Sequence, residues 1–378
     1  MTTRLYSICH ATPLMVIQHL RRHLRLPAAR EFLLWHPLGL VPAMDSFMRQ
    51  TIADAGFADT LDIRDFESLK PRTHGAATWL LESARRLRKD AITVRRWMKR
   101  NRISEDDVEL WTEDPIHFNT LFAKALLPNA RHVKFPHCFY LEDADTINYM
   151  ARLEAPWINA SWPKKILYWP WLRMVSGVDL AHRCVFDRGY TFDQPSAWTK
   201  SSIDVSNLIS IDAFRDTFET LPRVLREEVE SQLLPIRAGR KPLVLLLLFA
   251  LGPEIRQHYQ NCISRILAEH ADELESCTFA VKAHPSTQGR EEELFFDWLN
   301  VKMPGRVFPI RSGLNLEFLL PELRPDYVWA GPCGALPIVR RLKTGRPIAL
   351  REITDCFVKG YPTERAAYDV ILRDIEVW

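Results

Sequence analysis

A lysine and a histidine that follow a predicted buried strand are the residues of this chain best placed to hold an anion. Residues 278–281 form a run of β-branched and aromatic side chains, and Lys282, His284 and Pro285 come directly after it. Ligands of an open parallel sheet collect beyond the carboxyl ends of its strands, where these side chains would lie. Lysine brings a fixed positive charge and histidine exchanges a proton near neutral pH, so the turn suits an anionic ligand. Taken alone, the motif indicates no more than a surface loop that contains His and Pro.

The elements before this turn favour the anion site. Residues 243–250 (LVLLLLFA) predict a strand buried on both faces, and residues 254–268 predict the helix that crosses over to the next strand. A strand, a helix and a second strand that ends in a basic turn form half of a nucleotide-binding domain.

A pair of adjacent carboxylates is the second group that could do chemistry. Glu142 and Asp143 follow an extended apolar run and precede a helix predicted near Asp145. A carboxylate beside a reacting hydroxyl can act as general base, which typically contributes about 10²- to 10⁴-fold to the rate. The alternative is that these acids only stabilise the helix N-terminus through its dipole.

A glycine-rich turn later in the chain is predicted to bind phosphate through its backbone. Residues 326–330 predict a strand, Gly331 to Gly334 a turn, and residues 335–342 a helix. Backbone N–H groups at such a helix start bind phosphate without any side-chain hydroxyl. Cys333 has no base near it in the sequence, so we interpret it as a buried small residue and not as a nucleophile.

Two further positions are candidates for ligand contacts. Thr12 precedes Pro13 at a predicted strand-to-helix turn, where it either contacts a ligand or only caps the helix. Glu113 and Asp114, in the sequence TEDP, are candidates for a second acidic contact.

The composition is that of an ordinary globular protein in a reducing compartment. A length of 378 residues favours two domains, and a net charge of +3 does not indicate a dedicated nucleic-acid binder. The seven cysteines never occur as C-x-x-C, so neither a disulfide framework nor a zinc site is indicated. We expect no signal peptide, and the longest apolar run, 243–251, is too short to span a bilayer.

Strands and helices alternate through both halves, which predicts an α/β fold with parallel sheets. We expect an N-terminal Rossmann-like lobe over residues 1–165, a C-terminal lobe over 166–365 and a final helix within 366–378. The other predicted strands are residues 4–9, 31–35, 61–63, 108–111, 132–135, 184–191, 208–211, 306–309 and 347–350. The other predicted helices are residues 13–25, 42–55, 76–100, 115–126, 214–234, 291–300, 314–320 and 364–377.

Two segments could contact a membrane. The predicted helix 76–100 carries eight Lys and Arg residues, which form either a solvated face or a patch for an anionic polymer or the inner face of a membrane. Residues 157–174 (WINASWPKKILYWPWLRM) form either an aromatic linker between lobes or a segment that rests on a membrane.

The order of these motifs resembles a known family. A Thr-Pro turn at residues 12–13, an acidic pair at 142–143 and a Lys-x-His-Pro motif at 282–285 follow one another along most of the chain. The arrangement resembles the bacterial sialyltransferases of GT-B fold, the group that contains lipooligosaccharide sialyltransferases and capsule polysialyltransferases. The individual motifs are short.

The resemblance implies roles for these residues. Asp143, with Glu142 beside it, would deprotonate the acceptor hydroxyl, and His284 would contact the CMP phosphate. Lys282, Pro285 and Ser286 would add nucleotide contacts, as would Gly331, Cys333 and Gly334, while Thr12 and Asp114 would lie on the acceptor side. Two positions depart from the family: Ala144 stands where it has Gly, and Cys333-Gly334 replaces its Ser/Thr pair.

As the resemblance implies, we expect a GT-B-type protein whose two lobes face each other across a cleft, with the last helix crossing back to the first lobe. The expected reaction is inverting transfer of sialic acid or a related nonulosonate from a CMP-sugar to a bacterial surface glycan of the capsular or lipopolysaccharide kind. The alternatives are a CMP-Kdo-type transferase and an inactive glycan-binding protein of the envelope machinery. We expect no cofactor, no metal and no nucleic acid, and a cytoplasmic location with peripheral contact to the inner membrane.

Overall fold

The computed structural model describes most of the chain, and every statement below refers to the described part. The described residues are 2–9, 11–23, 26–36, 42–63, 76–113, 118–135, 170–171, 173–179, 186–191, 206–208, 222–239, 242–249, 251–284, 290–310, 316–360 and 365–378. They form two compact units, and each contains one parallel sheet.

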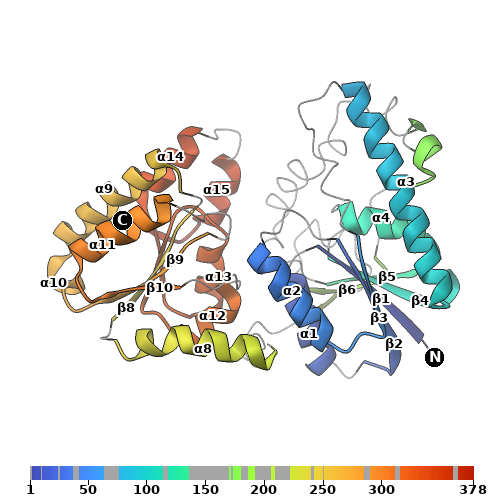
Figure 1. The fold of residues 1–378 in the computed structure, drawn as a ribbon, viewed down its shortest axis with the longest axis horizontal. Helices are drawn as coiled ribbons and strands as arrows, with labels where there is room; N and C mark the ends of the chain where they lie inside the picture. Colours follow the sequence, from blue (N-terminus) through green and yellow to red (C-terminus); the bar gives the residue numbers. More distant parts are fainter. Residues whose placement is uncertain are drawn as a thin grey trace. The chain divides into compact units, whose positions relative to one another are not determined.

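The first unit is built on a seven-stranded sheet in the order β3-β2-β1-β4-β5-β6-β7, in which every neighbouring pair is parallel (Figure 1). Its strands are β1 (Thr2–Ile8), β2 (Ala29–Trp35), β3 (Asp59–Asp62), β4 (Val108–Thr112), β5 (Arg131–Lys134), β6 (Arg188–Thr191) and β7 (Ser206–Leu208). The order changes direction between β1 and β4, so the carboxyl ends of these two strands form the topological switch point where such sheets bind ligands.

Helices cover both faces of this sheet because β2 alternates its side chains between them. Its even-numbered residues Phe32 and Leu34 belong to a buried cluster with residues of α3 and α4, whereas Glu31 pairs with Arg21 of α1 and Trp35 contacts Arg49 of α2. The helices are α1 (Ala11–His23), α2 (Pro42–Asp54), α3 (Ala76–Arg100) and α4 (Phe118–Leu126).

A buried ion network crosses the first sheet near its amino edge. Arg4 is 3% exposed; its guanidinium donates to Glu109 Oε2 at 3.2 Å and to Glu31 Oε1 at 3.4 Å. Arg188 donates to the other oxygen of Glu109 at 2.9 Å, and the Tyr6 hydroxyl donates to Glu31 at 2.8 Å. These contacts connect β1, β2, β4 and β6, so the network ties together strands from both sides of the switch point.

The second unit repeats the same topology. Its six-stranded parallel sheet has the order β10-β9-β8-β11-β12-β13. The strands are β8 (Leu243–Leu247), β9 (Thr278–Lys282), β10 (Val307–Ile310), β11 (Tyr327–Ala330), β12 (Arg346–Ala349) and β13 (Glu376–Val377). In this order β8 is equivalent to β1 and β11 to β4, so the second switch point lies between β8 and β11.

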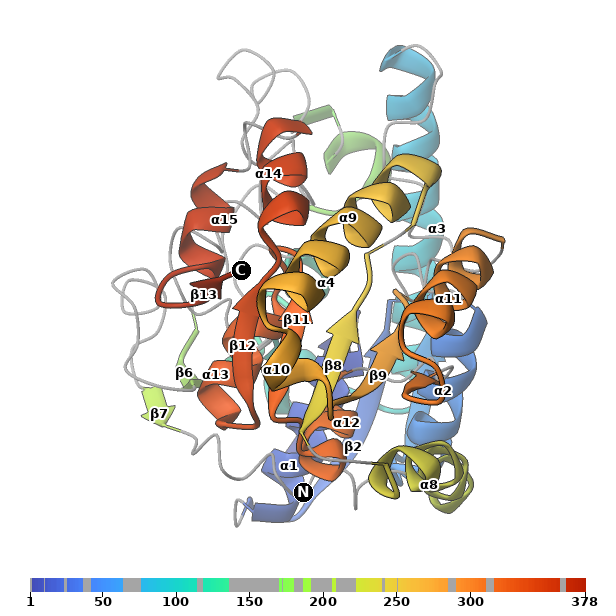
Figure 2. The same cartoon turned by 90° about the vertical axis from the view of Figure 1, so that its left-hand side faces the viewer.

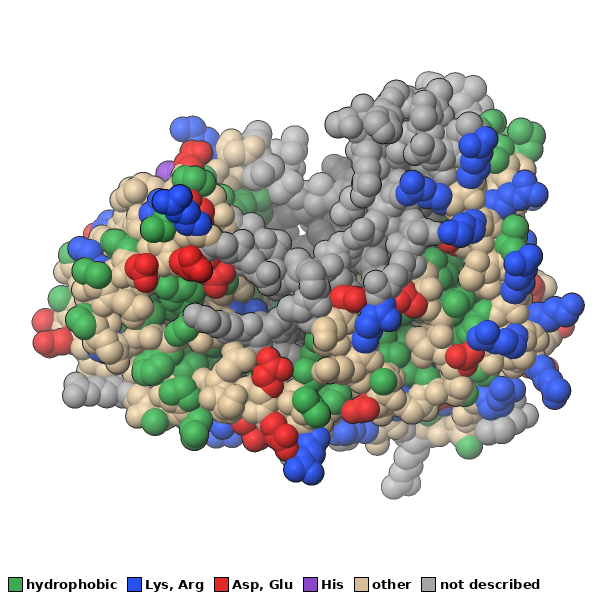
Figure 3. All heavy atoms as spheres, in the orientation of Figure 1, with side chains coloured by type: hydrophobic (Ala, Val, Ile, Leu, Met, Phe, Trp, Pro, Cys, Tyr) green, Lys and Arg blue, Asp and Glu red, His purple; other side chains and the backbone are tan. Residues whose placement is uncertain are grey.

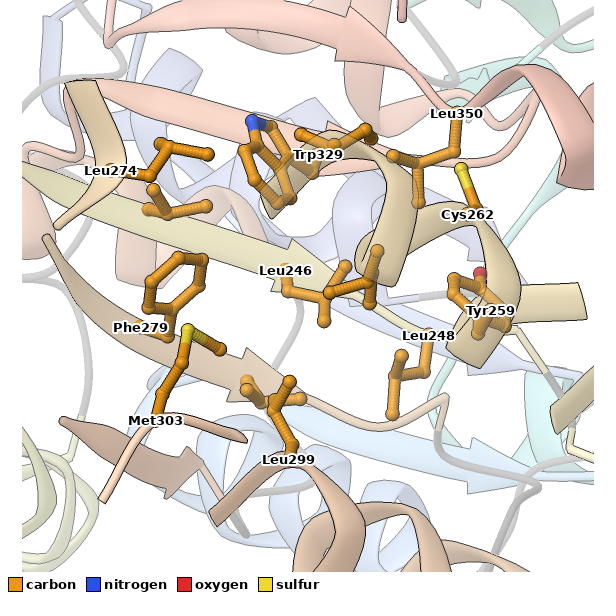
Figure 4. Packing of buried hydrophobic residues seen from close by; sticks show 14 of the residues in the cluster. Leu246, Leu248, Tyr259, Cys262, Leu274, Phe279, Leu299, Met303, Trp329 and Leu350 are labelled. Atoms are coloured by element: carbon orange, nitrogen blue, oxygen red, sulfur yellow. The ribbon is translucent and has the colours of Figure 1, made fainter. Parts of the chain in front are cut away.

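The helices of the second unit bury a continuous apolar core against this sheet. They are α8 (Arg223–Arg237), α9 (Pro253–Glu269), α10 (Ala271–Leu274), α11 (Arg290–Lys302), α12 (Leu316–Leu323), α13 (Ala335–Leu342), α14 (Arg351–Gly360) and α15 (Arg365–Ile371). Figure 2 shows α9 over the sheet with α11 and α14 on either side of it. In Figure 4, Tyr259 of α9 lies near Leu248 and Cys262 of α9 near Leu350, whereas Phe279 lies on the other side of the same buried cluster.

The domain limits differ in two places from those predicted. The predicted boundary at residues 165 and 166 precedes β6 and β7, which pair within the first sheet, and the first unit runs to Ser210. The C-terminal segment stays with the second unit: the helix predicted over residues 364–377 ends at Ile371, and β13 pairs with β12. Trp378 explains the change, because its ring stacks on His270 at 4.2 Å and packs against Trp329.

Candidate functional site

Lys282 and His284 lie together at the carboxyl edge of the second sheet. Lys282 is the last residue of β9 and is 7% exposed, and its carbonyl accepts the Leu248 N–H at 3.0 Å, which aligns it with the end of β8. His284 is exposed. Loss of hydration and then the positive charge of Lys282 lower the pKa of His284 below its usual value. The pair therefore presents a fixed cation and an imidazole that a bound anion would help to protonate.

The turn at residues 331–334 joins β11 to the N-terminus of α13 at the same edge. Gly334 is the N-cap, no side chain caps the helix, and the Leu336 N–H donates to the Cys333 carbonyl at 3.2 Å. Desolvation raises the pKa of the Cys333 thiol to about 11, which keeps it protonated at neutral pH. Cys333 is only partly buried, whereas we predicted a buried residue, but a protonated thiol is a poor nucleophile, as we interpreted it. The backbone is then the group of this turn able to bind phosphate.

Gly331 must be glycine because an aromatic ring lies directly against it. A Cβ atom at this position would lie 2.4 Å from the ring of Phe249 and 2.6 Å from Ile353. The Phe249 N–H donates to the Tyr259 hydroxyl at 3.1 Å, and its ring lies 4.4 Å from that of Phe357. The end of β8 is thereby packed against the start of the β11 turn.

A second helix N-terminus lies at this switch point. α9 follows β8 in the chain, with Gly252 as N-cap and Pro253 at the first position, so its N-cap residue has no side chain that could cap the helix. Together α9 and α13 place two uncapped helix starts beyond β8 and β11, where helix dipoles favour negative charge.

The first switch point carries a buried carboxylate instead. Glu113 follows β4 and is 0% exposed; its Oε1 accepts the Cys9 N–H at 3.0 Å and the Asn119 amide at 3.4 Å. The Cys9 thiol lies 3.6 Å from both carboxylate oxygens. Glu113 therefore satisfies the Cys9 N–H at the end of β1, and a carboxylate at this position opposes the binding of a second anion there.

Glu113 and Gly331 occupy equivalent positions in the two lobes. Each is the first residue after the strand that follows the switch, β4 in one sheet and β11 in the other. One lobe thus places a carboxylate where the other places no side chain at all, although their sheets share one topology. The two switch points are chemically different.

Buried histidines give the first unit a pH-dependent stability. His36, 0% exposed at the end of β2, has its pKa lowered to about 3 by burial, against an opposing influence of Glu113, and burial lowers the pKa of His132 to about 4. Below about pH 6.5 the unfolded chain takes up protons that the folded protein refuses, so stability falls as the pH is lowered. From about pH 7.5 to about pH 5 we expect a loss of about 2 kcal/mol for each histidine. Urea unfolding of wild type and of His36→Gln at both pH values measures this loss of unfolding free energy. Between the two pH values the variant should lose less stability than wild type, and equal losses in the two proteins would contradict a contribution from His36.

The structure describes only part of the predicted site. Lys282, His284, Gly331, Cys333 and Gly334 line the carboxyl edge of the second sheet, whereas Asp143, Glu142, Asp114, Pro285 and Ser286 lie outside the described residues. Thr12 lies within the first turn of α1, which begins at Ala11, and is therefore not its N-cap.

Sequence reasoning missed several features of the two switch points. Glu113 was considered only as an acidic ligand contact, and His36 and Gly252 were not singled out. The available signal was position, since each of the three lies within two residues of the end of a predicted strand or the start of a predicted helix.

Comparison with solved structures shows the fold. The UDP-GlcNAc 2-epimerase from Methanocaldococcus jannaschii aligns with 98% of this chain and 91% of its own at a TM-score of 0.52 and 12% identity. The fold is of the GT-B type. The Neisseria meningitidis UDP-GlcNAc 2-epimerase bound to UDP-GlcNAc (99% and 95% covered, TM-score 0.46, 11% identity) and the GT-B domain of a Photobacterium damselae sialyltransferase (100% and 100%, 0.49, 11%) are also similar. No family model and no curated protein matches the sequence.

Proposed function

We propose that this protein is a glycosyltransferase that takes its sugar from a nucleotide donor held by the second lobe. The observation that carries the proposal is the chemistry of the second switch point. Lys282, His284 and the starts of α9 and α13, whose N-caps are both glycine, lie at one edge of the sheet, and the turn of residues 331–334 carries no acidic side chain. Phosphate is the ligand that such an edge suits best.

The first lobe is the better candidate for the acceptor. The Glu113 carboxylate already accepts the Cys9 N–H after β1, so a phosphate at that switch point would meet a buried carboxylate. A neutral glycan hydroxyl does not meet this repulsion. The contrast between Glu113 and Gly331 supports a division of labour between two lobes of equal topology.

The family resemblance supplies the finer proposal, which is transfer of sialic acid or a related nonulosonate from its CMP donor with inversion. Asp143, with Glu142 beside it, takes the proton of the acceptor hydroxyl, and Lys282 and His284 stabilise the leaving phosphate without a metal. Pro285 and Ser286 continue the nucleotide contacts, whereas Thr12 and Asp114 belong to the acceptor side.

Release of nucleotide from defined donors tests this function. The purified protein is incubated separately with CMP-sialic acid, CMP-Kdo and UDP-GlcNAc, each with and without a glycan acceptor, and free CMP or UDP is measured. We expect acceptor-dependent release of CMP from CMP-sialic acid. Release only from CMP-Kdo would reassign the sugar, and release only of UDP would contradict a CMP donor. CMP binding without any turnover would favour an inactive binding protein.

The affinity for CMP is expected to rise as the pH falls, because a bound phosphate favours the imidazolium form of His284. Since the pKa of free His284 is lowered, binding should be accompanied by proton uptake near neutral pH. Calorimetric titration of wild type and His284→Gln from about pH 8 to about pH 6 isolates this effect, because CMP's own titration is common to both. His284→Gln should weaken CMP binding and should show a smaller rise in affinity between about pH 8 and about pH 6 than wild type does. If the two proteins bind CMP equally well at every pH, the phosphate binds away from His284.

A further inference from the structure

One exposed face of α3 carries positive charge without any negative charge among its described side chains. From Ala84 onward, the only acid of the helix is Asp90, which is 5% exposed, and the only exposed apolar residue is Ile92, at 38%. Figure 3 shows Lys and Arg side chains gathered over this helix. The exposed basic residues, which together form what we call the α3 stripe, are Arg85, Arg88, Lys89, Arg95, Arg96, Lys99 and Arg100.

The spacing of these residues makes them repel one another. Arg85 and Arg88 are three positions apart, and Arg95 and Lys99 are four apart, so each pair lies on one side of the helix, where like charges destabilise it. Arg100 pairs with Asp59 at 2.9 Å, but within the part of the chain that the structure describes no carboxylate pairs with Arg88, Arg95 or Lys99. An external anionic surface would relieve this repulsion.

The stripe is rigid because the opposite face of α3 belongs to the core. Leu87, Val94 and Trp97 are each at most 3% exposed and pack in the cluster beneath β1, β2 and β4. From Arg85 to Lys99 the stripe is about 21 Å long, at about 1.5 Å per residue. From residue 84 to residue 100, where the side chains of α3 are described, the apolar residues other than Ile92 are buried in the fold, so this part of the helix can lie against a charged surface but offers no apolar face to insert.

The composition of the stripe distinguishes between possible partners. Protein interfaces need a buried aromatic or apolar centre, and single-stranded nucleic acids use exposed aromatic rings for stacking. Among the described exposed side chains of α3, Ile92 alone is apolar and none is aromatic, since Trp97 is buried. A bilayer with anionic headgroups requires only an array of positive charges. No described helix has the length and apolar content of a bilayer-spanning segment.

We propose that the α3 stripe docks the protein peripherally on a membrane surface rich in anionic lipid. This docking does not depend on the proposed transferase activity. Binding is electrostatic, so it weakens as salt is added. Each Lys or Arg close to such a surface strengthens binding about five-fold, and reversing three of them should weaken it at least about 100-fold.

Vesicle sedimentation tests the proposal with the full chain. Wild type is mixed with vesicles of phosphatidylcholine alone or of phosphatidylcholine with phosphatidylglycerol, at low and high salt. We expect binding only to the anionic vesicles at low salt. The variant Arg88→Glu/Arg95→Glu/Lys99→Glu should lose this binding, and the same three positions changed to Gln, which perturb the fold less, should show an intermediate loss.

A control variant with the same change in net charge, placed away from α3, separates the effect of position from that of total charge. Arg223→Glu/Lys302→Glu/Lys343→Glu reverses three exposed charges of the second unit and should bind the anionic vesicles far better than the α3 variant. Equal losses in the two triple variants would overturn the proposal in favour of net charge alone. Unchanged binding by the α3 variant would also overturn it, as would wild-type binding to heparin but not to vesicles.

Discussion

Asp143→Asn is expected to reduce turnover with CMP-sialic acid by about 10²- to 10⁴-fold, because the amide cannot accept the proton of the acceptor hydroxyl. The affinity for CMP should remain that of wild type, since the nucleotide is proposed to bind to the second lobe. Initial rates of CMP release and calorimetric titration with CMP give the two quantities separately.

The neighbouring acid Asp145 provides the control. Asp145 lies at the predicted helix start, so Asp145→Asn should leave turnover within a few-fold of wild type. Equal losses in the two variants would contradict a specific role for Asp143. A loss of CMP affinity in Asp143→Asn would instead assign this residue to the nucleotide.

Arg4→Met is expected to lower the free energy of unfolding by about 3 kcal/mol, at the lower end of values for breaking a buried ion pair. The guanidinium of Arg4 contacts Glu109, Glu31 and the carbonyl of Pro27, at 3.2, 3.4 and 2.7 Å, and methionine replaces none of these donors. Arg188 and Arg21 remain to compensate part of the charge, which limits the loss. Urea unfolding followed by circular dichroism measures it.

An exposed arginine supplies the comparison for Arg4. Arg223 pairs with Glu227 on the surface of α8, where its side chain is 84% exposed, and Arg223→Met should cost at most about 0.5 kcal/mol. In the double variant Arg4→Met/Glu109→Gln the losses should be less than additive, because the substitution of Glu109 removes the carboxylate that Arg4→Met leaves without its partner. Equal costs for Arg4→Met and Arg223→Met would show that the network adds no stability.

The strands predicted best from the sequence are those that bury apolar runs, as β8 and β9 do. β8 and β9 were placed within a few residues, and α3 was predicted with the bounds that the structure shows. What escaped prediction depends on contacts distant in sequence. β13 is two residues long and exists through its pairing with β12, and α14 begins where the Arg351 N–H donates to the carbonyl of Trp378.

The sequence predicted which residues of the candidate site share one sheet edge, but it did not predict the side-chain contacts around them. Lys282, His284 and the turn at residues 331–334 follow strands of one predicted sheet, so their common edge follows from parallel topology. The burial of Glu113 against Cys9 could not be read from TEDP, because it depends on the adjacency of β1 and β4 across about 100 residues of sequence. The same holds for the ring of Phe249 that excludes a side chain at Gly331.

A crystal structure of the complex with CMP tests the central claim most directly. We predict that the phosphate lies beyond the carboxyl ends of β8 and β11, within hydrogen-bond distance of backbone N–H groups at the start of α13 and of His284. A phosphate bound at the first switch point, beside Glu113, or away from both sheet edges would contradict it.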